Sequence, residues 1–416
     1  MQNHNRQEAY FLYALSFLFL PVAVLATAQV WVLAVSGVLG ILAIRAVHGG
    51  IALKPNGLLV VMMMMLIGWA ATTSFWAMSP DRAIQTSIRI SLVCISLIVL
   101  VDAAKKLDQK QREKFGYWLV GGTVTGLVLT GILILWGGAI SVWLGENRLT
   151  GHELADLNRT STVISLLAWP VALIAAKTYG RLAAAAVIVF SALLLFALAP
   201  STPLVAFAVG LVAFIIAWIS PGLGKRGLLL AFAGAVIIVP LLDVLAPPLI
   251  DFLAANLPVP HSEIHRLVIW QFAAERIFEH PLVGWGLDAS RAIPGNNEEV
   301  YLFQFGANAE TGQAMPLHPH NALIQIWLEL GIVGVILIGA IFSLIVALIP
   351  SALHDRARPA TLIATTACAF TIAQLGFGIW QGWWMATLGL MVMIAIATGT
   401  NPPAPAGRQG RPGRND

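Results

Sequence analysis

Long apolar runs constrain this chain more than any other feature of its sequence. Of its 416 residues, 58% are hydrophobic and only 11% are charged, whereas charged residues make up about 25% of a soluble domain. A helix of roughly 20 apolar residues crosses the hydrocarbon core of a bilayer, and runs such as 337–349 do not alternate as the strands of a membrane barrel would. The sequence therefore predicts an all-α polytopic membrane protein. Twelve segments have the required character: 10–28, 30–47, 57–78, 86–101, 116–138, 160–178, 182–199, 203–220, 226–246, 320–349, 359–379 and 383–399.

Basic residues indicate how these segments are oriented, because Lys and Arg beside membrane helices are retained in the cytoplasm. Most of the 24 Lys and Arg residues fall on one side of the predicted bundle, including all five between 105 and 114. We therefore expect both termini to be cytoplasmic, and we attribute the net charge of +4 to topology rather than to nucleic-acid binding. The expected parts are helices one to nine in 1–246, a loop domain on the opposite side in 247–319, helices ten to twelve in 320–399, and a disordered cytoplasmic tail in 400–416.

The connection at 247–319 is long, and long ordered loops usually carry function. Its stretch 261–286 begins with apolar residues at helical spacing, and Pro281 and Gly284 end that pattern. The polar segment 288–316 follows. We expect this connection to form a cap on the outer membrane face.

Seven arginines lie in or near the external segments, where basic residues are otherwise rare. Any one of them can be a solvated surface charge, but seven together favour an anionic ligand, because the guanidinium group matches phosphate oxygens bidentately. A cluster at this level suits the phosphate or pyrophosphate of a lipid. Arg89 lies in an apolar segment, where an unpaired charge is costly, so it should face a cavity or a carboxylate, for which Glu329 is the natural candidate. The seven are Arg82, Arg89, Arg148, Arg159, Arg266, Arg276 and Arg291.

A polar stripe runs through the predicted tenth helix. Asn321, Gln325 and Glu329 recur every four residues and therefore share one helix face. This pattern predicts a cavity-lining helix whose external mouth carries His318 and His320. The alternative is a structural ladder of hydrogen bonds between helices.

The two histidines suggest acid–base chemistry. An imidazole with an ordinary pKa of about 6.5 can act as a general base near neutral pH. Metal ligation is the rival interpretation, but no third or fourth Cys, His or carboxylate stands at a familiar ligand spacing from His318 and His320. Cys94 and Cys368 lie inside predicted helices, which indicates neither a disulfide framework nor a thiolate cluster. The spacing therefore disfavours a zinc site.

The residues around His320 resemble a known signature. The pattern of His-Asn, nine residues, Gly, two residues and Gly runs from His320-Asn321 to Gly331 and Gly334 and is similar to that of the O-antigen ligase and polymerase superfamily of bacterial inner-membrane proteins. The segment HRLVIWQFAAERIFEHPLVGWG in the loop looks like the conserved periplasmic segment of that family. LNRTSTVISLLAWP and FWAMSPDRA also resemble family segments at corresponding places. Twelve helices with a large loop between the ninth and tenth match the ligase architecture.

The resemblance implies a reaction in the bacterial inner membrane with a periplasmic active site. A glycan carried on undecaprenyl pyrophosphate would be transferred to a sugar hydroxyl of lipid A-core or another glycan acceptor, without metal or nucleotide and with inversion. By position, His320 would orient or deprotonate the acceptor and Arg266 would hold the pyrophosphate, so these two are the catalytic candidates. The candidate substrate-binding residues are Arg159, Asn158, Arg82, Arg89, His318, Asn321, Arg276, Arg291 and Glu329.

One departure from the family concerns the turn between the seventh and eighth helices. Many members carry an Arg after a Ser there, but residues 199–203 read Ala-Pro-Ser-Thr-Pro. The second phosphate-binding arginine is therefore missing from its usual place. We expect Arg159, or Arg82 together with Arg89, to supply the charge.

Three other functions fit parts of the pattern. A polymerase joins two lipid-linked glycans, and an oligosaccharyltransferase delivers the glycan to protein; one large loop favours the ligase over both. A transporter of lipid-linked glycans would also have many helices around a cationic cavity. Transporters often carry paired broken helices in two repeated halves, and the polar motifs here concentrate instead on the external loops.

Overall fold

The computed structural model of the chain describes residues 2–48, 50, 53–143, 153–198, 201–256, 261–305, 308–351 and 355–399. The tail predicted to be disordered, 400–416, lies outside the described residues, as does Arg148.

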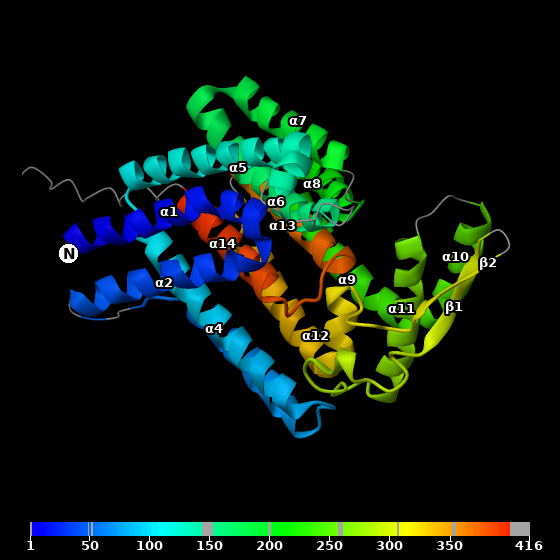
Figure 1. Ribbon diagram of the computed structural model, residues 1–416. Helices are drawn as coiled ribbons and strands as arrows, with labels where there is room; N and C mark the ends of the chain where they lie inside the picture. Colours follow the sequence, from blue (N-terminus) through cyan, green and yellow to red (C-terminus); the bar gives the residue numbers. More distant parts are fainter. Residues whose placement is uncertain are drawn as a thin grey trace, which may run out of the picture.

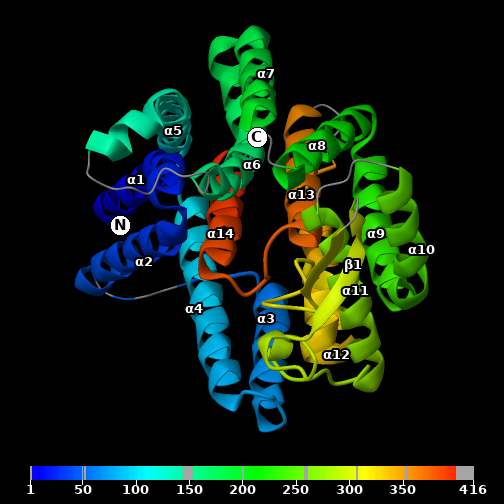
Figure 2. The ribbon, with the colours of Figure 1, turned by 45° about the vertical axis from the view of Figure 1, so that its right-hand side comes forward.

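Fourteen α-helices account for most of the described part of the chain (Figures 1 and 2). They are α1 (Gln2–Ala26), α2 (Val30–Val47), α3 (Gly57–Thr72), α4 (Pro80–Lys105), α5 (Gln109–Trp143), α6 (Glu153–Tyr179), α7 (Arg181–Leu198), α8 (Ser201–Ile219), α9 (Pro221–Ile238), α10 (Leu242–Asn256), α11 (His261–Glu279), α12 (Ala322–Leu348), α13 (Ala357–Leu375) and α14 (Gly382–Ala397). Short 3-10 turns stand at η1 (Thr27–Gln29), η2 (Thr73–Phe75), η3 (Val239–Leu241) and η4 (Ala289–Arg291).

The all-α polytopic architecture agrees with the sequence prediction. Each of the twelve predicted segments coincides with a helix: α1 to α9, α12, α13 and α14. Among the described residues, nine helical stretches are long and apolar enough to cross a membrane. The first of these, Asn5–Val47, holds both α1 and α2, so the number of crossings stays a prediction. The nine are Asn5–Val47, Gly57–Phe75, Pro80–Lys105, Gln109–Trp136, Leu157–Tyr179, Arg181–Leu198, Ser201–Ile219, Pro221–Asn256 and Ala322–Leu348.

The centre of the bundle is α6. It is 78% buried over its most apolar window and packs against α7 and α13. Its hydroxyl groups at Ser161 and Ser165 are fully buried and donate to carbonyl oxygens of their own helix, which satisfies them without water. The helix therefore holds a fixed position at the core, and its first turns reach the site described below.

A buried ion cluster ties three helices together at one end of the bundle. The guanidinium group of Arg45 on α2 lies 2.7 Å from a carboxylate oxygen of Glu8 on α1 and 2.9 Å from one of Asp102 on α4. Lys106 also contacts Asp102, at 2.8 Å. Breaking such a pair leaves an uncompensated buried charge, so this cluster fixes the relative positions of α1, α2 and α4.

The predicted loop domain contains α10, α11 and a β-hairpin, which lie at the side of the molecule opposite the N-terminus (Figure 1). Helix α11 occupies the first part of the stretch expected to be helical, which confirms that prediction. The hairpin was not predicted: β1 (Glu299–Phe305) pairs antiparallel with β2 (Asn308–Gln313), with an irregular register between Tyr301 and Phe303. The hairpin packs its buried Leu302 against Ala246, Ile250 and Ile264 of the two helices.

Helix α12 is interrupted at Gly331, whose φ of 66° and ψ of −170° are non-helical. The segment before Asp288 docks into this break. The amide of Ile332 donates to the carbonyl oxygen of Pro281 at 3.0 Å, and the amide of Gly286 donates to that of Glu329 at 2.9 Å. A β-carbon at Gly331 would lie 2.1 Å from the carbonyl oxygen of Leu282, so only glycine fits both the conformation and the close approach.

Candidate active site

The segment from His318 to Asn321 stands at the external start of α12. His320 has a φ of 56°, a left-handed conformation that is uncommon outside glycine and that clusters at functional sites. Asn321 follows as the N-cap, and its side-chain oxygen accepts from the amide of Ile324 at 3.1 Å. Trp270 of α11 donates its indole N–H to the carbonyl oxygen of Pro319 at 2.7 Å. The loop domain and the helix cap therefore hold this segment from two sides.

The imidazole of His320 has one nitrogen committed to the protein. Its Nδ1 lies 2.8 Å from the carbonyl oxygen of Gly376, at the end of α13. A carbonyl oxygen can only accept, so Nδ1 donates and the neutral ring keeps an unprotonated Nε2. Burial lowers the pKa of His320 below its ordinary value; the hydrogen bond to Gly376 acts in the opposite direction, and the nearby charge of Arg266 lowers the pKa further. The ring is therefore neutral at pH 7, with a lone pair available at Nε2.

His318 lies beside His320, with 4.3 Å between the two ring centroids. It is 7% exposed, and burial, helped by the charges of His320 and Arg291, lowers its pKa to about 3. The side-chain nitrogen of Gln381 is 3.2 Å from its Nε2. A β-carbon at Gly378 would come within 2.9 Å of its ring. His318 is thus a neutral, tightly packed neighbour of His320.

The sequence analysis did not single out the connection between α13 and α14, residues 376–381, which encloses both histidines. Gly376 bonds His320, and Gln381 contacts His318. The signal that could have found it is its composition: a Gly-x-Gly, a Trp and a Gln between two apolar segments. We refer to residues 376–381 as the α13–α14 loop.

Gln325 and Glu329 hold the α13–α14 loop against α12. The side-chain oxygen of Gln325 accepts from the amide of Ile379 at 2.9 Å, and its nitrogen donates to Glu329 at 3.0 Å. Trp380 donates its indole N–H to Glu329 at 2.6 Å. Both side chains are buried, so this part of the polar stripe forms the hydrogen-bond ladder and does not line an open cavity.

Glu329 also anchors the loop domain. It accepts from the backbone amide of Asp288 at 2.7 Å and from the hydroxyl group of Ser290. With the bonds from Gln325 and Trp380, the carboxylate accepts four hydrogen bonds and is fully buried. The expected pairing of Glu329 with Arg89 is therefore wrong: the guanidinium group of Arg89 donates instead to the carbonyl oxygen of Trp380 at 3.3 Å.

Arg266 lies on α11 close to His320, whose pKa it lowers. Its guanidinium group donates to Glu263 at 3.1 Å and to the hydroxyl group of Thr202 at 3.4 Å. Thr202 belongs to the turn in which the family arginine is missing, and its hydroxyl group donates to the carbonyl oxygen of Leu375. Arg266 therefore places a positive charge beside the turn in which many family members carry an arginine, and near the end of α13.

Two further predicted residues come from the first described turns of α6. The guanidinium group of Arg159 lies over the ring of Trp383, 5.8 Å from its centroid, and Trp383 donates to Gln381 at 2.7 Å. The side-chain oxygen of Asn158 is buried and has no hydrogen-bond partner among the described residues. These contacts place Arg159 next to Trp383, which bonds Gln381, and Gln381 in turn contacts His318.

The remaining arginines are distributed unevenly. Arg291 in η4 is near enough to His318 to influence its pKa. Arg276 instead pairs with Glu279 and lies over the ring of Phe272, 4.9 Å from the centroid, within the loop domain. Arg82 is exposed in the first turn of α4. Among the described residues, no recorded hydrogen bond or ion pair joins Arg82 or Arg276 to the histidines.

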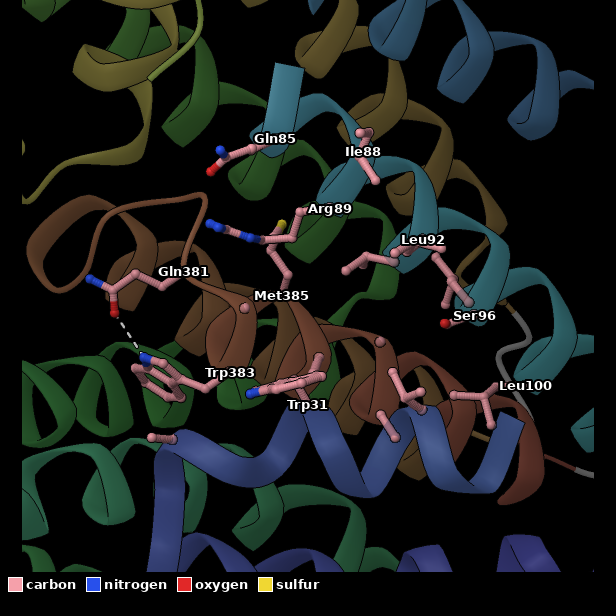
Figure 3. A pocket seen from close by; sticks show the side chains of 18 residues that line it. Trp31, Gln85, Ile88, Arg89, Leu92, Ser96, Leu100, Gln381, Trp383 and Met385 are labelled. Atoms are coloured by element: carbon pink, nitrogen blue, oxygen red, sulfur yellow. Dashed lines mark hydrogen bonds between the residues drawn. The ribbon is translucent and has the colours of Figure 1, made fainter. Parts of the chain in front are cut away.

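Arg89 faces a cavity of about 710 Å³ between α2, α4 and α14, as Figure 3 shows. The prediction that it faces a cavity or a carboxylate is confirmed for the cavity. Gln381 and Trp383 line the same space, so the cavity adjoins the histidine site. In the described part of the chain, no group of three or more His, Cys, Asp or Glu side chains is arranged to hold a metal ion.

Comparison with known proteins agrees with the motif-based resemblance. Residues 185–339, from α7 into α12, match the family described as O-Antigen ligase. A protein of Rickettsia conorii named "Putative polysaccharide ligase" is 26% identical over 335 residues, which cover 80% of this chain and 78% of the relative. A protein of the same description from Rickettsia bellii is 27% identical over 338 residues, with the same coverage. No solved structure matches the chain at a significant level. Residues 185–339 therefore match the O-antigen ligase family, in agreement with the resemblance of the motifs that lie in this part of the chain.

Proposed function

We propose that the protein is a membrane glycosyltransferase that transfers a glycan from undecaprenyl pyrophosphate to lipid A-core. The observation that carries the proposal is the arrangement of His320: Nδ1 is held by the Gly376 carbonyl oxygen at 2.8 Å, while Arg266 lies nearby. A neutral imidazole with one fixed nitrogen is suited to act as a general base, and an adjacent guanidinium group suits a phosphate.

In the proposed reaction the acceptor hydroxyl oxygen forms a bond to the anomeric carbon of the donor sugar. The bond from that carbon to the pyrophosphate oxygen breaks, and its electron pair leaves with undecaprenyl pyrophosphate. The hydroxyl proton passes to Nε2 of His320. Direct attack inverts the configuration at the anomeric carbon, and the residues named here need no metal or nucleotide for this transfer.

Arg266 and Arg159 are the residues we assign to the pyrophosphate, with Arg89 at the adjoining cavity. Arg266 bonds Thr202, in the turn where many family members carry an arginine. Arg159 extends from α6 and lies over the ring of Trp383. A pair of guanidinium groups from two helices can neutralise the two negative phosphates as the leaving group departs. Gln325 and Glu329 act in this proposal as positioning residues, since both are buried behind the α13–α14 loop.

We also propose twelve membrane crossings in the bacterial inner membrane, with the active site periplasmic and both termini cytoplasmic. Basic residues gather at one end of the bundle: Arg45 pairs with Asp102, and Arg112 donates to the carbonyl oxygen of Ile396 near the end of α14. The histidines lie by the start of α14, at its other end. Retention of basic residues in the cytoplasm then favours a periplasmic site.

The test is transfer in vitro from an undecaprenyl-pyrophosphate glycan to purified lipid A-core, by wild type and by His320→Ala. His48→Ala is the matched control, because His48 stands at the opposite end of α2 from the cavity mouth and bonds Gln7. Loss of transfer in His320→Ala alone, with an unchanged melting temperature, is the expected result. Chain growth by wild type with donor alone would identify a polymerase instead, and transport without transfer would contradict both.

A further inference from the structure

The cavity between α2, α4 and α14 has apolar walls along most of its length. Leu92 and Leu97 of α4, Trp31 of α2, and Met385 and Ala386 of α14 form much of its surface. Gln85 and Leu100 mark its extent along α4 and are fifteen positions apart, or about 22 Å at roughly 1.5 Å per residue. Such a space accepts an extended hydrocarbon chain.

Polar groups gather at one end of this cavity. Figure 3 shows Gln85, Arg89 and Gln381 together at that end, whereas Leu100 lies at the other. The guanidinium group of Arg89 has five N–H donors, and its recorded hydrogen bond is a single contact with the Trp380 carbonyl oxygen. Among the described residues no carboxylate forms an ion pair with Arg89. The cavity therefore presents a cation at the head of an apolar channel.

The polar end adjoins the histidine site. Gln381 lines the cavity and also stands 3.2 Å from Nε2 of His318. Trp383 lines it as well and carries the guanidinium group of Arg159 over its ring. A phosphate bound at Arg89 would thus lie beside the residues to which a sugar must be presented.

We propose that this cavity binds the polyisoprenyl chain of an anionic lipid, with the phosphate next to that chain at Arg89 and, in a pyrophosphate, the phosphate next to the sugar at Arg159 and Arg266. The inference rests on the proposed function, in which the donor is a lipid of this kind, and adds the place and the residues that recognise its chain. Charge complementarity favours an anionic head group, and a single channel suits a one-chain lipid better than a diacyl phospholipid. The exposed side chains of Trp31, Ile88 and Leu92 at the margin allow entry from the bilayer.

Gly389 provides a way to fill the cavity without disturbing its walls. It lines the space, and an added β-carbon would meet no atom within 4 Å. Gly131 on α5 is a matched control, because it is also half-buried and open to a β-carbon but is not part of the cavity lining. Gly389→Leu should therefore weaken binding of a polyisoprenyl chain, whereas Gly131→Leu should not.

The experiment measures binding of undecaprenyl phosphate to the purified full-length protein in detergent by native mass spectrometry. We expect at least tenfold weaker binding by Gly389→Leu and unchanged binding by Gly131→Leu. Arg89→Gln should bind undecaprenyl phosphate and the uncharged undecaprenol equally, whereas wild type should prefer the phosphate. Equal binding by wild type and Gly389→Leu would overturn the inference, and so would equally strong binding of phosphatidylglycerol to wild type, since the cavity would then hold ordinary bilayer lipid.

Binding is measured without acceptor and without transfer, so the two proposals fail separately. If wild type transfers glycan normally but Gly389→Leu binds the lipid as strongly as wild type does, only the cavity proposal is rejected. Chain-specific binding that depends on Gly389 and Arg89, with no transfer to any acceptor, would reject only the glycosyltransferase.

Discussion

Nδ1 of His320 lies 2.8 Å from the carbonyl oxygen of Gly376, and this contact joins the start of α12 to the end of α13. A backbone carbonyl oxygen cannot be removed by substitution and cannot donate, so it fixes the imidazole in one tautomer. The left-handed backbone of His320 and the N-cap at Asn321 aim the ring at this acceptor.

The pH dependence of transfer should follow the neutral form of His320. Burial lowers its pKa, so the neutral ring persists below the ordinary value of about 6.5. As pH falls through the lowered pKa, Nε2 becomes protonated and can no longer accept the hydroxyl proton. A profile of kcat/KM between pH 4.5 and 8 should therefore lose activity on its acidic side with a midpoint below 6.5. A midpoint above 6.5 would mean that the base is another group.

Gly378→Ala should impair catalysis with little effect on folding. The new β-carbon would meet the ring of His318 at 2.9 Å, which forces the α13–α14 loop or the histidine pair to shift. Small displacements of reacting groups reduce rates strongly, so we expect kcat to fall by about tenfold or more. Gly68→Ala on α3 is the control, because its β-carbon meets nothing within 4 Å. An unchanged kcat in Gly378→Ala would show that the loop does not position the histidines.

Glu329→Gln separates a positioning role from a substrate-binding role. The carboxylate accepts hydrogen bonds from four donors, and an amide nitrogen would face some of those donors without an acceptor. Such a mismatch in a buried site costs about 1–3 kcal/mol. We expect a lower melting temperature and a reduced kcat with little change in KM, and no such effects for the exposed Glu275→Gln. A raised KM at normal stability would instead indicate contact with substrate.

Arg266 and Arg276 should differ in their effect on the donor. Loss of a hydrogen bond to a charged group costs about 1.5–3 kcal/mol, which corresponds to a rise in donor KM of about 10- to 100-fold for Arg266→Gln. Arg276→Gln should change KM only slightly, because Arg276 pairs with Glu279 and lies over Phe272, and among the described residues no hydrogen bond or ion pair joins it to the histidines. Steady-state kinetics with varied donor make the comparison, and equal effects of the two variants would show that the phosphate is not held specifically by Arg266.

The helices followed directly from the sequence because length and hydrophobicity alone determine whether a segment suits the bilayer. The stripe of Asn321, Gln325 and Glu329 also predicted a shared face, since helical periodicity determines the direction in which side chains point. It did not predict the neighbours on that face: Trp380, Asp288 and Ser290 come from distant segments and occupy the place expected for Arg89.

Besides α10 (Leu242–Asn256), most of which was expected as loop, two elements escaped sequence analysis for different reasons. The β-hairpin is short, its paired residues in β2 are largely polar, and it forms because Leu302 is buried against α10 and α11. The α13–α14 loop contains no charged residue, and its Gly-x-Gly, Trp and Gln are only a weak sign of a site. Its importance comes from a backbone carbonyl group and from Gln381, and a main-chain acceptor leaves no mark in the sequence.

The interruption of α12 at Gly331 determines which segments of the chain can be exchanged between relatives as one piece. Because residues 281–286 bond to carbonyl and amide groups on both sides of the break, the outer part of α12 belongs to the same hydrogen-bonded unit as the loop domain. A chimaera that exchanges only the loop between two relatives would divide this unit. A graft that preserves it must carry the chain from the docking segment through Gly331 as one piece.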